Sequence, residues 1–516
     1  MKRLLKTAVA VALCGIAQLA CATDAPALFQ AHCASCHGPD RLGLIAPALL
    51  PGNLDRLRKP DAVKTVTNGR LATQMPPFAD KLSADDIRQL VDYIYTPPPA
   101  APAWGIDAIR ASRIQYHAPG SLPDKPVFKA DPLNLFVVVE LGDHHATILD
   151  GDRFEPITRF PTRFALHGGP KFSPDGRYVY FCSRDGWIAK YDIWNLTLVA
   201  EVRAGINARN MAVSSDGRYA IVANYLPHTL VVLDTKDLSP IRVFDVKSRD
   251  GKSSRVSAVY DAAPRKSFVA AMKDIPEVWE LSYDDKAEPV FDGFVHDYKM
   301  AEGLATPGPF APRRIELDDY LDDFFFDAHY DDMIGASREG RGQVVNLNVR
   351  RKIASIDLPG MPHLGSGISW NYQGRTVLAS PNLKEGVVTV VDMKTWQTVK
   401  HIKTLGPGFF MRSHENTPYA WVDAFNSKEH HDVIQIIDKQ KLEVVAQVQP
   451  SPGKIAAHTE FTRDGRYALV SVWDDDGALV VYDAKTLQEV KRLPMKKPSG
   501  KYNVYNKITR SEGTSH

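Results

Sequence analysis

Two different patterns of apolar and polar positions divide the chain near residue 130. From there to the end, short β-rich runs alternate with turn signals, and the unit repeats. The repeated turn is Ser173-Pro174-Asp175-Gly176-Arg177-Tyr178, which recurs at 214–219 and 462–467 and more weakly at 371–375. Each copy precedes an apolar strand, a second strand ending in Asp, and a last strand. The copies at Asp175 and Asp216 are about 40 residues apart, the length of a four-stranded propeller blade.

Degenerate copies of the repeated unit account for the remaining blades. They fall near Ala263-Pro264-Arg265-Lys266, near Ala328-His329-Tyr330 and near Asn416-Thr417-Pro418-Tyr419, and a further strand is expected at 135–140. The region 283–320 is too irregular for one blade and is expected to carry a long loop. Residues 131–516 therefore predict an all-β propeller of eight blades, with seven left open.

The N-terminal part has the period of helices instead. A short helix is expected from Ala25 to Cys33, and a second begins after Ser83, a good N-cap, with Asp85 and Asp86 in its first turn. Ile87, Leu90, Val91 and Ile94 then recur on one face. Residues 23–97 predict a small all-α domain. The proline-rich run from Thr96 opens a linker over 98–130, stiff at first and then irregular.

The first 22 residues have the pattern of an export signal. Lys2, Arg3 and Lys6 precede a short apolar run, and Ala20-Cys21-Ala22 is a small-x-small cleavage site. A lipoprotein cysteine at Cys21 is the alternative. The sequence therefore predicts a periplasmic protein. Cys14 and Cys21 would leave with the signal.

Composition excludes several classes of function. The 516 residues carry a net charge of +2, which gives no general electrostatic case for nucleic acid. Beyond the N-terminus, no apolar run is long enough to span a bilayer, so no transmembrane segment is expected.

The strongest chemical signal is Cys33-Ala34-Ser35-Cys36-His37, the attachment motif of a c-type haem. Each thiol can bind the haem covalently, and His37 can bind the iron. A redox disulfide or half a zinc site is the alternative, but no second Cys or Cys/His pair at zinc spacing follows. If both cysteines carry haem, Cys182 is the remaining cysteine of the mature chain, and no internal disulfide forms.

The sixth iron ligand is expected to be Met75. It stands in Gln74-Met75-Pro76-Pro77-Phe78, a loop stiffened by two prolines, and no other methionine follows the signal in this domain. Core filling is the alternative role for this side chain.

Three histidines stand six to ten positions before a blade's repeated turn: His167, His363 and His458. In a propeller such positions lie at the mouth of the central channel, so three blades are expected to direct imidazoles at one axis. Glycines adjoin His167 and His363, which permits close approach of a flat ligand. Arg184 and Arg209 lie nearby and suit carboxylate arms. Zinc is the rival ligand.

With these motifs the chain resembles the cytochrome cd1 family over its mature length. His167 with Ser183-Arg184-Asp185-Gly186 resembles the d1-haem ligand region, Met361-Pro362-His363 resembles a distal-pocket segment, and 500–506 is similar to the family's last segment. The resemblance implies His167 as iron ligand, Arg184 and Arg209 as cofactor-binding residues, a covalent haem c, and non-covalent haem d1 or dihydro-haem d1.

The sequence differs from the family's nitrite reductases at several positions, and the functional prediction follows from these differences. Asp322 and Asp323 stand near the place of a second distal histidine, with His329 close by, while His458 has no histidine counterpart there and Ser366 replaces an arginine. The pattern is more similar to the branch that oxidises a propionate of dihydro-haem d1 to acrylate. His363 and His458 are then the catalytic candidates, a periplasmic electron acceptor is required, and a cytochrome cd1 nitrite reductase receives the product. Nitrite reduction and non-catalytic d1 carriage are the alternatives.

Overall fold

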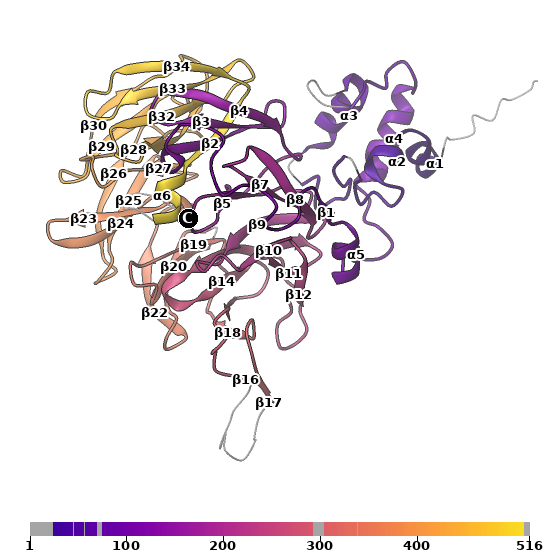
Figure 1. Ribbon diagram of the computed structural model, residues 1–516, viewed down its shortest axis with the longest axis horizontal. Helices are drawn as coiled ribbons and strands as arrows, with labels where there is room; N and C mark the ends of the chain where they lie inside the picture. The colour runs from indigo at the N-terminus through magenta and orange to yellow at the C-terminus, as the bar shows by residue number, and fades with distance from the viewer. Residues whose placement is uncertain are drawn as a thin grey trace, which may run out of the picture.

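The computed structural model describes residues 24–44, 46–55, 57–69, 75–292, 304–337 and 339–509. The predicted signal segment, with Cys14 and Cys21, and Gln74 of the methionine loop lie outside these residues. Figure 1 shows a small helical part beside a large ring of β-sheets. Among the described residues, no helix is long and apolar enough to cross a membrane.

The helical part contains α1 (Ala25–His32), α2 (Ala34–His37), α3 (Lys59–Asn68) and α4 (Ala84–Ile94). The predicted cap of α4 is confirmed as a capping box: Ser83 Oγ accepts from Asp86 N at 3.1 Å, and the Asp86 carboxylate accepts from Ser83 N at 3.1 Å. The expected apolar face of α4 is buried against Phe29 of α1. Helix α3 was not predicted, because few apolar positions mark its inner side.

The connection between the two parts is more ordered than the sequence predicted. It contains α5 (Ile106–Ala111) and β1 (Ile114–Gln115), which pairs antiparallel with the outer strand of a blade through Ile114 and Glu201. The side chain of Ile109 is fully buried against that blade. The prediction of an irregular connection was wrong, because one buried residue in a six-residue helix leaves no periodic signal.

The β-sheets confirm a propeller of eight blades. The first four blades, each given from its innermost strand outward, are β5 (Lys171–Phe172), β6 (Tyr178–Cys182), β7 (Trp187–Asp192) and β8 (Thr197–Arg203); β9 (Asn207–Val213), β10 (Tyr219–Leu226), β11 (Thr229–Asp234) and β12 (Pro240–Asp245); β13 (Val256–Ala262), β14 (Ser267–Met272), β15 (Glu277–Ser282) and β18 (Pro312–Glu316); and β19 (Asp323–Phe326), β20 (Asp332–Ala336), β21 (Arg341–Asn346) and β22 (Arg351–Asp357).

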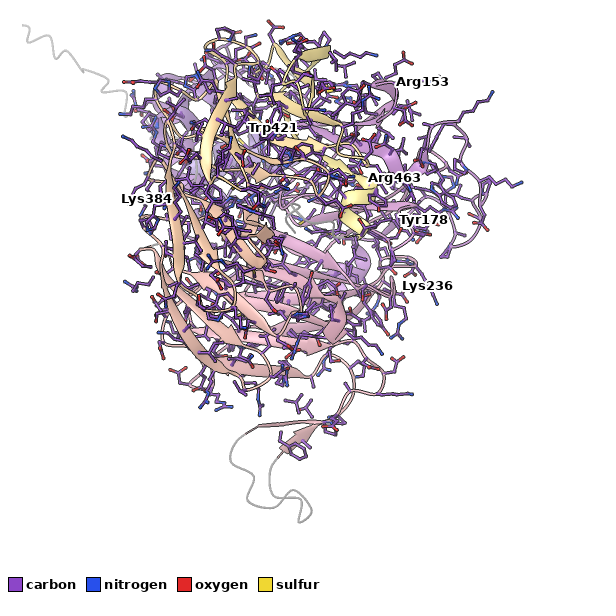
Figure 2. All side chains as sticks on the ribbon, turned by 90° about the vertical axis from the view of Figure 1, so that its left-hand side faces the viewer. Arg153, Tyr178, Lys236, Lys384, Trp421 and Arg463 are labelled. Carbon is purple, nitrogen blue, oxygen red and sulfur yellow. The ribbon has the colours of Figure 1, made fainter. Side chains whose placement is uncertain are left out.

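The next three blades are β23 (Ile368–Tyr372), β24 (Arg375–Pro381), β25 (Val387–Asp392) and β26 (Thr398–Lys403); β27 (Met411–Arg412), β28 (Tyr419–Asp423), β29 (Ile434–Asp438) and β30 (Glu443–Val448); and β31 (Ala456–Phe461), β32 (Tyr467–Val472), β33 (Gly477–Asp483) and β34 (Glu489–Met495). Trp421 of β28 lies fully buried among these strands (Figure 2). The long loop expected in 283–320 includes the hairpin of β16 (Val290–Asp292) and β17 (Leu304–Thr306), which projects from the ring (Figure 1).

The last blade closes the ring by joining the two ends of the propeller. Its inner strand β35 (Pro498–Asn503) comes from the C-terminus and pairs with β2 (Leu135–Glu140), with Phe136 opposite Asn503. Strands β3 (His145–Asp150) and β4 (Glu155–Pro161) complete the sheet, and α6 (Val504–Thr509) follows β35. Because both ends share one sheet, the ring cannot open without breaking this ladder.

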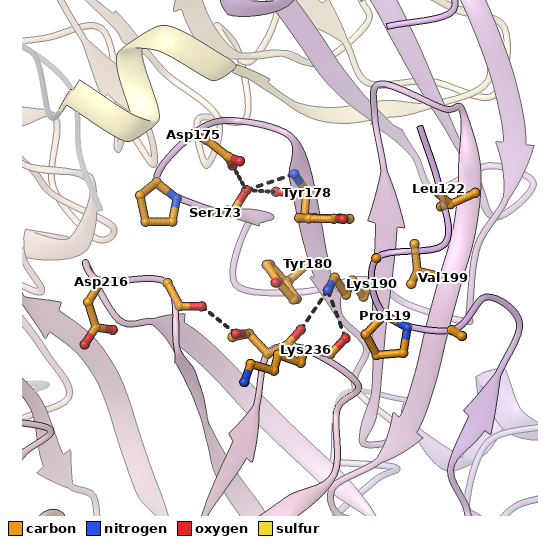
Figure 3. A pocket seen from close by; sticks show the side chains of 15 residues that line it. Pro119, Leu122, Ser173, Asp175, Tyr178, Tyr180, Lys190, Val199, Asp216 and Lys236 are labelled. Carbon is orange, nitrogen blue, oxygen red and sulfur yellow. Dashed lines mark hydrogen bonds between the residues drawn. The ribbon is translucent and has the colours of Figure 1, made fainter. Parts of the chain in front are cut away.

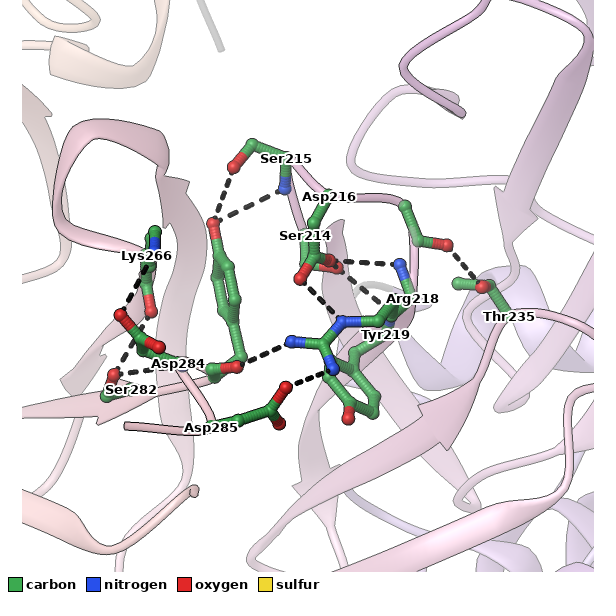
Figure 4. Close-up of polar contacts among 12 residues, drawn as sticks. Ser214, Ser215, Asp216, Arg218, Tyr219, Thr235, Lys266, Ser282, Asp284 and Asp285 are labelled. Carbon is green, nitrogen blue, oxygen red and sulfur yellow. Dashed lines mark hydrogen bonds and ion pairs between the residues drawn. The ribbon is translucent and has the colours of Figure 1, made fainter. Parts of the chain in front are cut away.

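The repeated turn joins the first and second strands of its blade, and in the second blade it also contacts the neighbouring blade. In the second blade Ser214 Oγ donates to Asp216 Oδ1 at 2.6 Å, and Arg218 N donates to the same oxygen at 3.0 Å (Figure 4). Arg218 also reaches the third blade, where its Nη1 lies 2.8 Å from Asp285 Oδ2.

A pocket of about 430 Å³ lies between the first two blades (Figure 3). There Lys190 Nζ donates to the Thr235 carbonyl at 2.8 Å. Side-chain contacts of this kind hold adjacent blades in register.

The closing ladder makes a stability prediction. Phe136 is fully buried beside Leu469 and Leu479 of the preceding blade. Replacing Phe136 with Ala leaves a cavity at this junction and should lower the free energy of unfolding by about 3–5 kcal/mol. Chemical denaturation followed by circular dichroism measures the change. The control is Val445→Ala on outer strand β30, where the side chain is 44 % exposed and little loss is expected. Equal losses in the two variants would contradict this account of the closure.

Candidate functional site

The haem-attachment motif occupies the α1–α2 junction. Cys33 caps both helices, and neither Cys33 nor Cys36 is in a disulfide. Burial raises the pKa of the Cys33 thiol to about 11. His37 is buried, and its Nδ1 donates to the Pro47 carbonyl at 2.7 Å. That bond leaves Nε2 as the nitrogen with the lone pair, and burial lowers the pKa of the imidazole, so the ring is neutral as an iron ligand must be.

Met75 packs against the same apolar core as Cys33, between the helices of this part. The chain reaches it through Gly69, whose φ of +71° and close approach to Met75 O and Pro77 N leave no room for a side chain. Two unbridged thiols, a neutral imidazole and a thioether thus belong to one small helical part, and Cys33 and Met75 pack against its apolar core. These residues fit a covalently attached haem, and the role of Met75 as sixth ligand stays a prediction.

His167 lies in the loop that enters β5, four residues before the strand begins. Its Nδ1 donates to the Arg209 carbonyl at 2.7 Å, and Arg184 Nη2 lies 2.9 Å from its Nε2. Because a guanidinium only donates, this network assigns the lone pair to Nε2. The Arg209 guanidinium lies 3.3 Å from the same ring. The structure therefore brings His167, Arg184 and Arg209 into one partly exposed cluster.

Two glycines permit this loop to lie against its neighbours. Gly168 has φ +81°, and a Cβ there would come 2.7 Å from Asn210 Cβ. Gly169 has φ +69° and its Cβ position is 3.1 Å from the Tyr502 ring. Both positions require glycine because protein groups lie close to them, whereas the sequence prediction ascribed the glycines to the approach of a flat ligand.

His363 stands in the loop before β23 and contacts two other blades. Its Nδ1 donates to the Phe409 carbonyl at 2.7 Å, and its Nε2 lies 3.9 Å from Asp323 Oδ2. Asp323 also accepts from Tyr260 Oη at 2.9 Å and from Gly365 N at 2.8 Å. Burial lowers the pKa of His363, and the Asp323 carboxylate opposes that shift.

His458 differs from the prediction in its local structure, because it lies within β31 and not in the loop before it. A bulge between Ala457 and Glu460 interrupts the ladder, and His458 adopts φ +51°. Such a backbone conformation is uncommon for a residue with a side chain. The ring is 2 % exposed and contacts Phe410 and Tyr502, at centroid distances of 4.8 and 5.0 Å.

Charge around His458 disfavours its protonated form. Burial is the main cause of a pKa well below the ordinary value, and the cations Lys501, Arg412 and Lys507 add to it. They come from β35, β27 and α6 respectively. Among the described residues, His458 Nδ1 has no hydrogen-bond partner. The imidazole is therefore neutral at pH 7 and able to accept a proton.

Aromatic contacts join His363 and His458, and they extend to the loop that carries His167. The His363 ring lies 4.4 Å from Phe409, and Phe409 lies 4.5 Å from Phe410, which contacts His458. Tyr502 then leads from His458 to the glycines after His167. Asp423 holds the Phe409–Phe410 pair by accepting from Phe409 N at 2.6 Å, and burial raises the pKa of Asp423 to about 6.

Several residues around the three histidines were not predicted as site residues. They are Lys171, Tyr260, Asp323, Phe409, Phe410, Arg412, Lys501 and Tyr502. Asp323 begins the innermost strand β19, so the positional argument that selected the histidines would also have selected it. Burial lowers the pKa of Lys171, at the start of innermost strand β5, to about 8.

Two alternatives from the sequence receive no structural support. His329 lies in the β19–β20 turn, beyond the far end of β19 from Asp323. Among the described residues, no three His, Cys, Asp or Glu side chains gather as metal ligands, so the three histidines do not form a zinc site of the usual kind.

Cys182, at the end of β6, is buried, and burial raises the pKa of its thiol to about 12.

Known proteins match both parts of the chain. The family "Cytochrome D1 heme domain" matches residues 130–507, and "Cytochrome C oxidase, cbb3-type, subunit III" matches residues 20–94. Dihydro-heme d1 dehydrogenase of Pseudomonas aeruginosa is 55 % identical, with 100 % of each chain covered. Nitrite reductase of Stutzerimonas stutzeri is 24 % identical, with 93 % of this chain and 92 % of that one covered.

A solved structure agrees with these matches. The structure "Dihydro-heme d1 dehydrogenase NirN in complex with DHE" superposes with a TM-score of 0.88 and 56 % identity, covering 93 % of this chain and 99 % of that one. Together with a family match over most of the chain and high identity along its whole length, this places the protein in the cytochrome d1 haem-domain family.

Proposed function

We propose that this protein is a dihydro-haem d1 dehydrogenase, which oxidises a propionate arm of its tetrapyrrole substrate to acrylate. The observation that supports it most is the convergence of His167, His363 and His458 from three blades on one axis, beside a part built for a covalent haem. The relative of that name, 55 % identical over the full length, points to the same reaction class.

His167 and its two arginines suit the binding of the substrate. Because Nδ1 of His167 is bound to the Arg209 carbonyl, Nε2 carries the lone pair, and it can ligate the substrate iron once Arg184 Nη2, which lies 2.9 Å from it, turns to a carboxylate arm. Arg184 and Arg209 border the same imidazole and can pair with the carboxylate arms.

His458 is the proposed general base. A base must be neutral before it acts, and burial together with three surrounding cations holds His458 in that form. His363 lies on the other side of Phe410 and close to Asp323, which suits it to orient the reacting arm or to take part in the proton transfer. Two C–H bonds on adjacent carbons break and a C=C bond forms, so two protons and two electrons leave the substrate.

The electrons need a carrier within the protein. Cys33, Cys36, His37 and Met75 are the residues that would hold a haem there, and the haem would supply reversible one-electron transfer. Because such a carrier takes one electron at a time, a second one-electron acceptor, placed by this proposal in the periplasm, must accept electrons from it. The product, haem d1, would pass to a cytochrome cd1 nitrite reductase.

The reaction itself is tested on the purified protein with dihydro-haem d1 and a one-electron acceptor. We expect the mass of the recovered pigment to fall by two hydrogens, together with a changed absorption spectrum. Pigment that is bound and released at its original mass would indicate a carrier instead. Nitrite turnover by the reduced protein would indicate a reductase.

Replacement of His458 tests its role as base. His458→Ala should bind dihydro-haem d1 normally, while the rate of conversion falls about 100- to 10,000-fold, the range for loss of a general base. The binding constant comes from absorption titration, and the rate comes from pigment mass over time. His401→Ala, an exposed histidine on outer strand β26, is the matched control. Full conversion by His458→Ala would refute the role.

The pH profile tests the electrostatic part of the argument. The activity of a neutral base is lost as pH falls through its pKa, so the acid limb of kcat/KM should lie below the ordinary histidine pKa. Arg412→Met removes a guanidinium that stays charged near His458 and should move that limb to higher pH. Arg153→Met, on an exposed turn, should leave it in place. A limb that stays fixed in Arg412→Met would show that another group controls it.

A further inference from the structure

Arg203 joins the helical part of the molecule to the propeller. It ends β8 of the first blade, and its side chain is 4 % exposed. Its Nη2 donates to the Leu42 carbonyl at 2.5 Å and its Nη1 to the Gly43 carbonyl at 3.3 Å, both in the helical part. Its Nε donates to the Asp185 carbonyl at 2.9 Å, in the propeller. One guanidinium therefore binds the main chain of both parts.

The Leu42–Gly43 segment belongs to the loop that follows the haem-attachment motif. Gly43 N donates to the His37 carbonyl at 2.8 Å, and Ala46 N donates to the Cys36 carbonyl at 3.0 Å. Gly43 has φ +83°, and a Cβ there would come 3.0 Å from Arg203 Nη2 and 2.8 Å from Ala48 N. Arg203 thus lies one main-chain hydrogen bond away from the proposed iron ligand His37.

The other end of the contact lies next to the d1 site. Asp185, which accepts from Arg203 Nε, directly follows Arg184, and Arg184 Nη2 lies 2.9 Å from His167 Nε2. Arg184 N also donates to the Ala165 carbonyl at 3.0 Å, within the loop of His167. A continuous series of short contacts thus leads from His37 through Arg203 to His167.

The arrangement keeps a buried cation at the junction. Burial lowers the pKa of Arg203, opposed by Asp185, and the guanidinium lies 4.9 Å over the Trp104 ring. Its hydrogen bonds go to main-chain carbonyls of the helical part and of the propeller. The planar guanidinium makes these bonds in a fixed geometry that a lysine ammonium cannot reproduce. Asn53 and Asn207 add one bond each across the same junction, both at 3.1 Å.

We propose that Arg203 is a positioning residue for electron transfer, holding the loop of the c-haem ligand His37 and the loop of the d1-site residues Arg184 and His167 in one fixed relation. This proposal rests on the proposed function. In that function, electrons leave the substrate one at a time for the haem on Cys33 and Cys36 and then pass to an external one-electron acceptor. Arg203 positions the two sites for the first of these transfers.

The test is a single-turnover reduction of the c-haem by bound dihydro-haem d1, followed by absorption. In Arg203→Met we expect the rate to fall about 10-fold or more, since positioned reactions are sensitive to shifts of about 1 Å. Affinity for dihydro-haem d1 and reduction of the c-haem by a small chemical reductant should stay within about twofold, because neither needs the junction. Arg242→Met, an exposed arginine on β12, is the control.

An unchanged single-turnover rate in Arg203→Met would overturn the proposal, as would a fall matched by Arg242→Met. If Arg203→Met does not fold, Arg203→Lys replaces it as the test. This variant keeps the positive charge but loses the planar guanidinium, so it should also slow the single-turnover reduction of the c-haem. If dihydro-haem d1 does not reduce the c-haem of the unaltered protein, the proposed function fails separately. Hydrogen exchange of the Gly43 amide, which donates to the His37 carbonyl, then tests the junction, and an exchange rate unchanged in Arg203→Met would remove its positioning role.

Discussion

The ladder between β2 and β35 is the constraint on which the site depends. Eight sheets that each bury both faces can be arranged around one axis once the first and last strands share a sheet. The start of every innermost strand then lies at the same rim, whatever its distance along the chain. His167, Asp323, His363 and His458 are separated by up to about 300 positions and still belong to one set of contacts, because closure brings their blades together.

Electrostatics explains why imidazoles and cations occur together at this axis. A tetrapyrrole with several carboxylates needs positive charge around it, and Arg184, Arg209, Lys171 and Arg412 provide it. The same charge, with burial, lowers the pKa of the histidines. A site that binds a polyanionic substrate therefore also prepares neutral bases. Asp323 limits this effect at His363, which gives the two candidate histidines different environments.

Much of this could be predicted from the sequence, where the signal is local or repeated. The haem-attachment motif, the cap at Ser83 and the repeated turn each depend on neighbouring residues, and the three axial histidines follow from their distance to that turn. The α5 helix, the bulge at His458 and the contacts of Arg203 could not be predicted. Each depends on segments that meet after folding; Arg203 bonds to residues about 160 positions away. Asp323 was within reach of the positional argument but was read as a departure from a family pattern.

The burial of Cys182 bears on the thiol chemistry of the folded protein. A thiolate, not a thiol, attacks a disulfide, and a thiol whose pKa is raised to about 12 stays protonated. Within the described residues, the other free thiols are Cys33 and Cys36. Once the propeller has folded, Cys182 is therefore protected from disulfide exchange with that pair, and a cross-link between the two parts of the molecule is disfavoured.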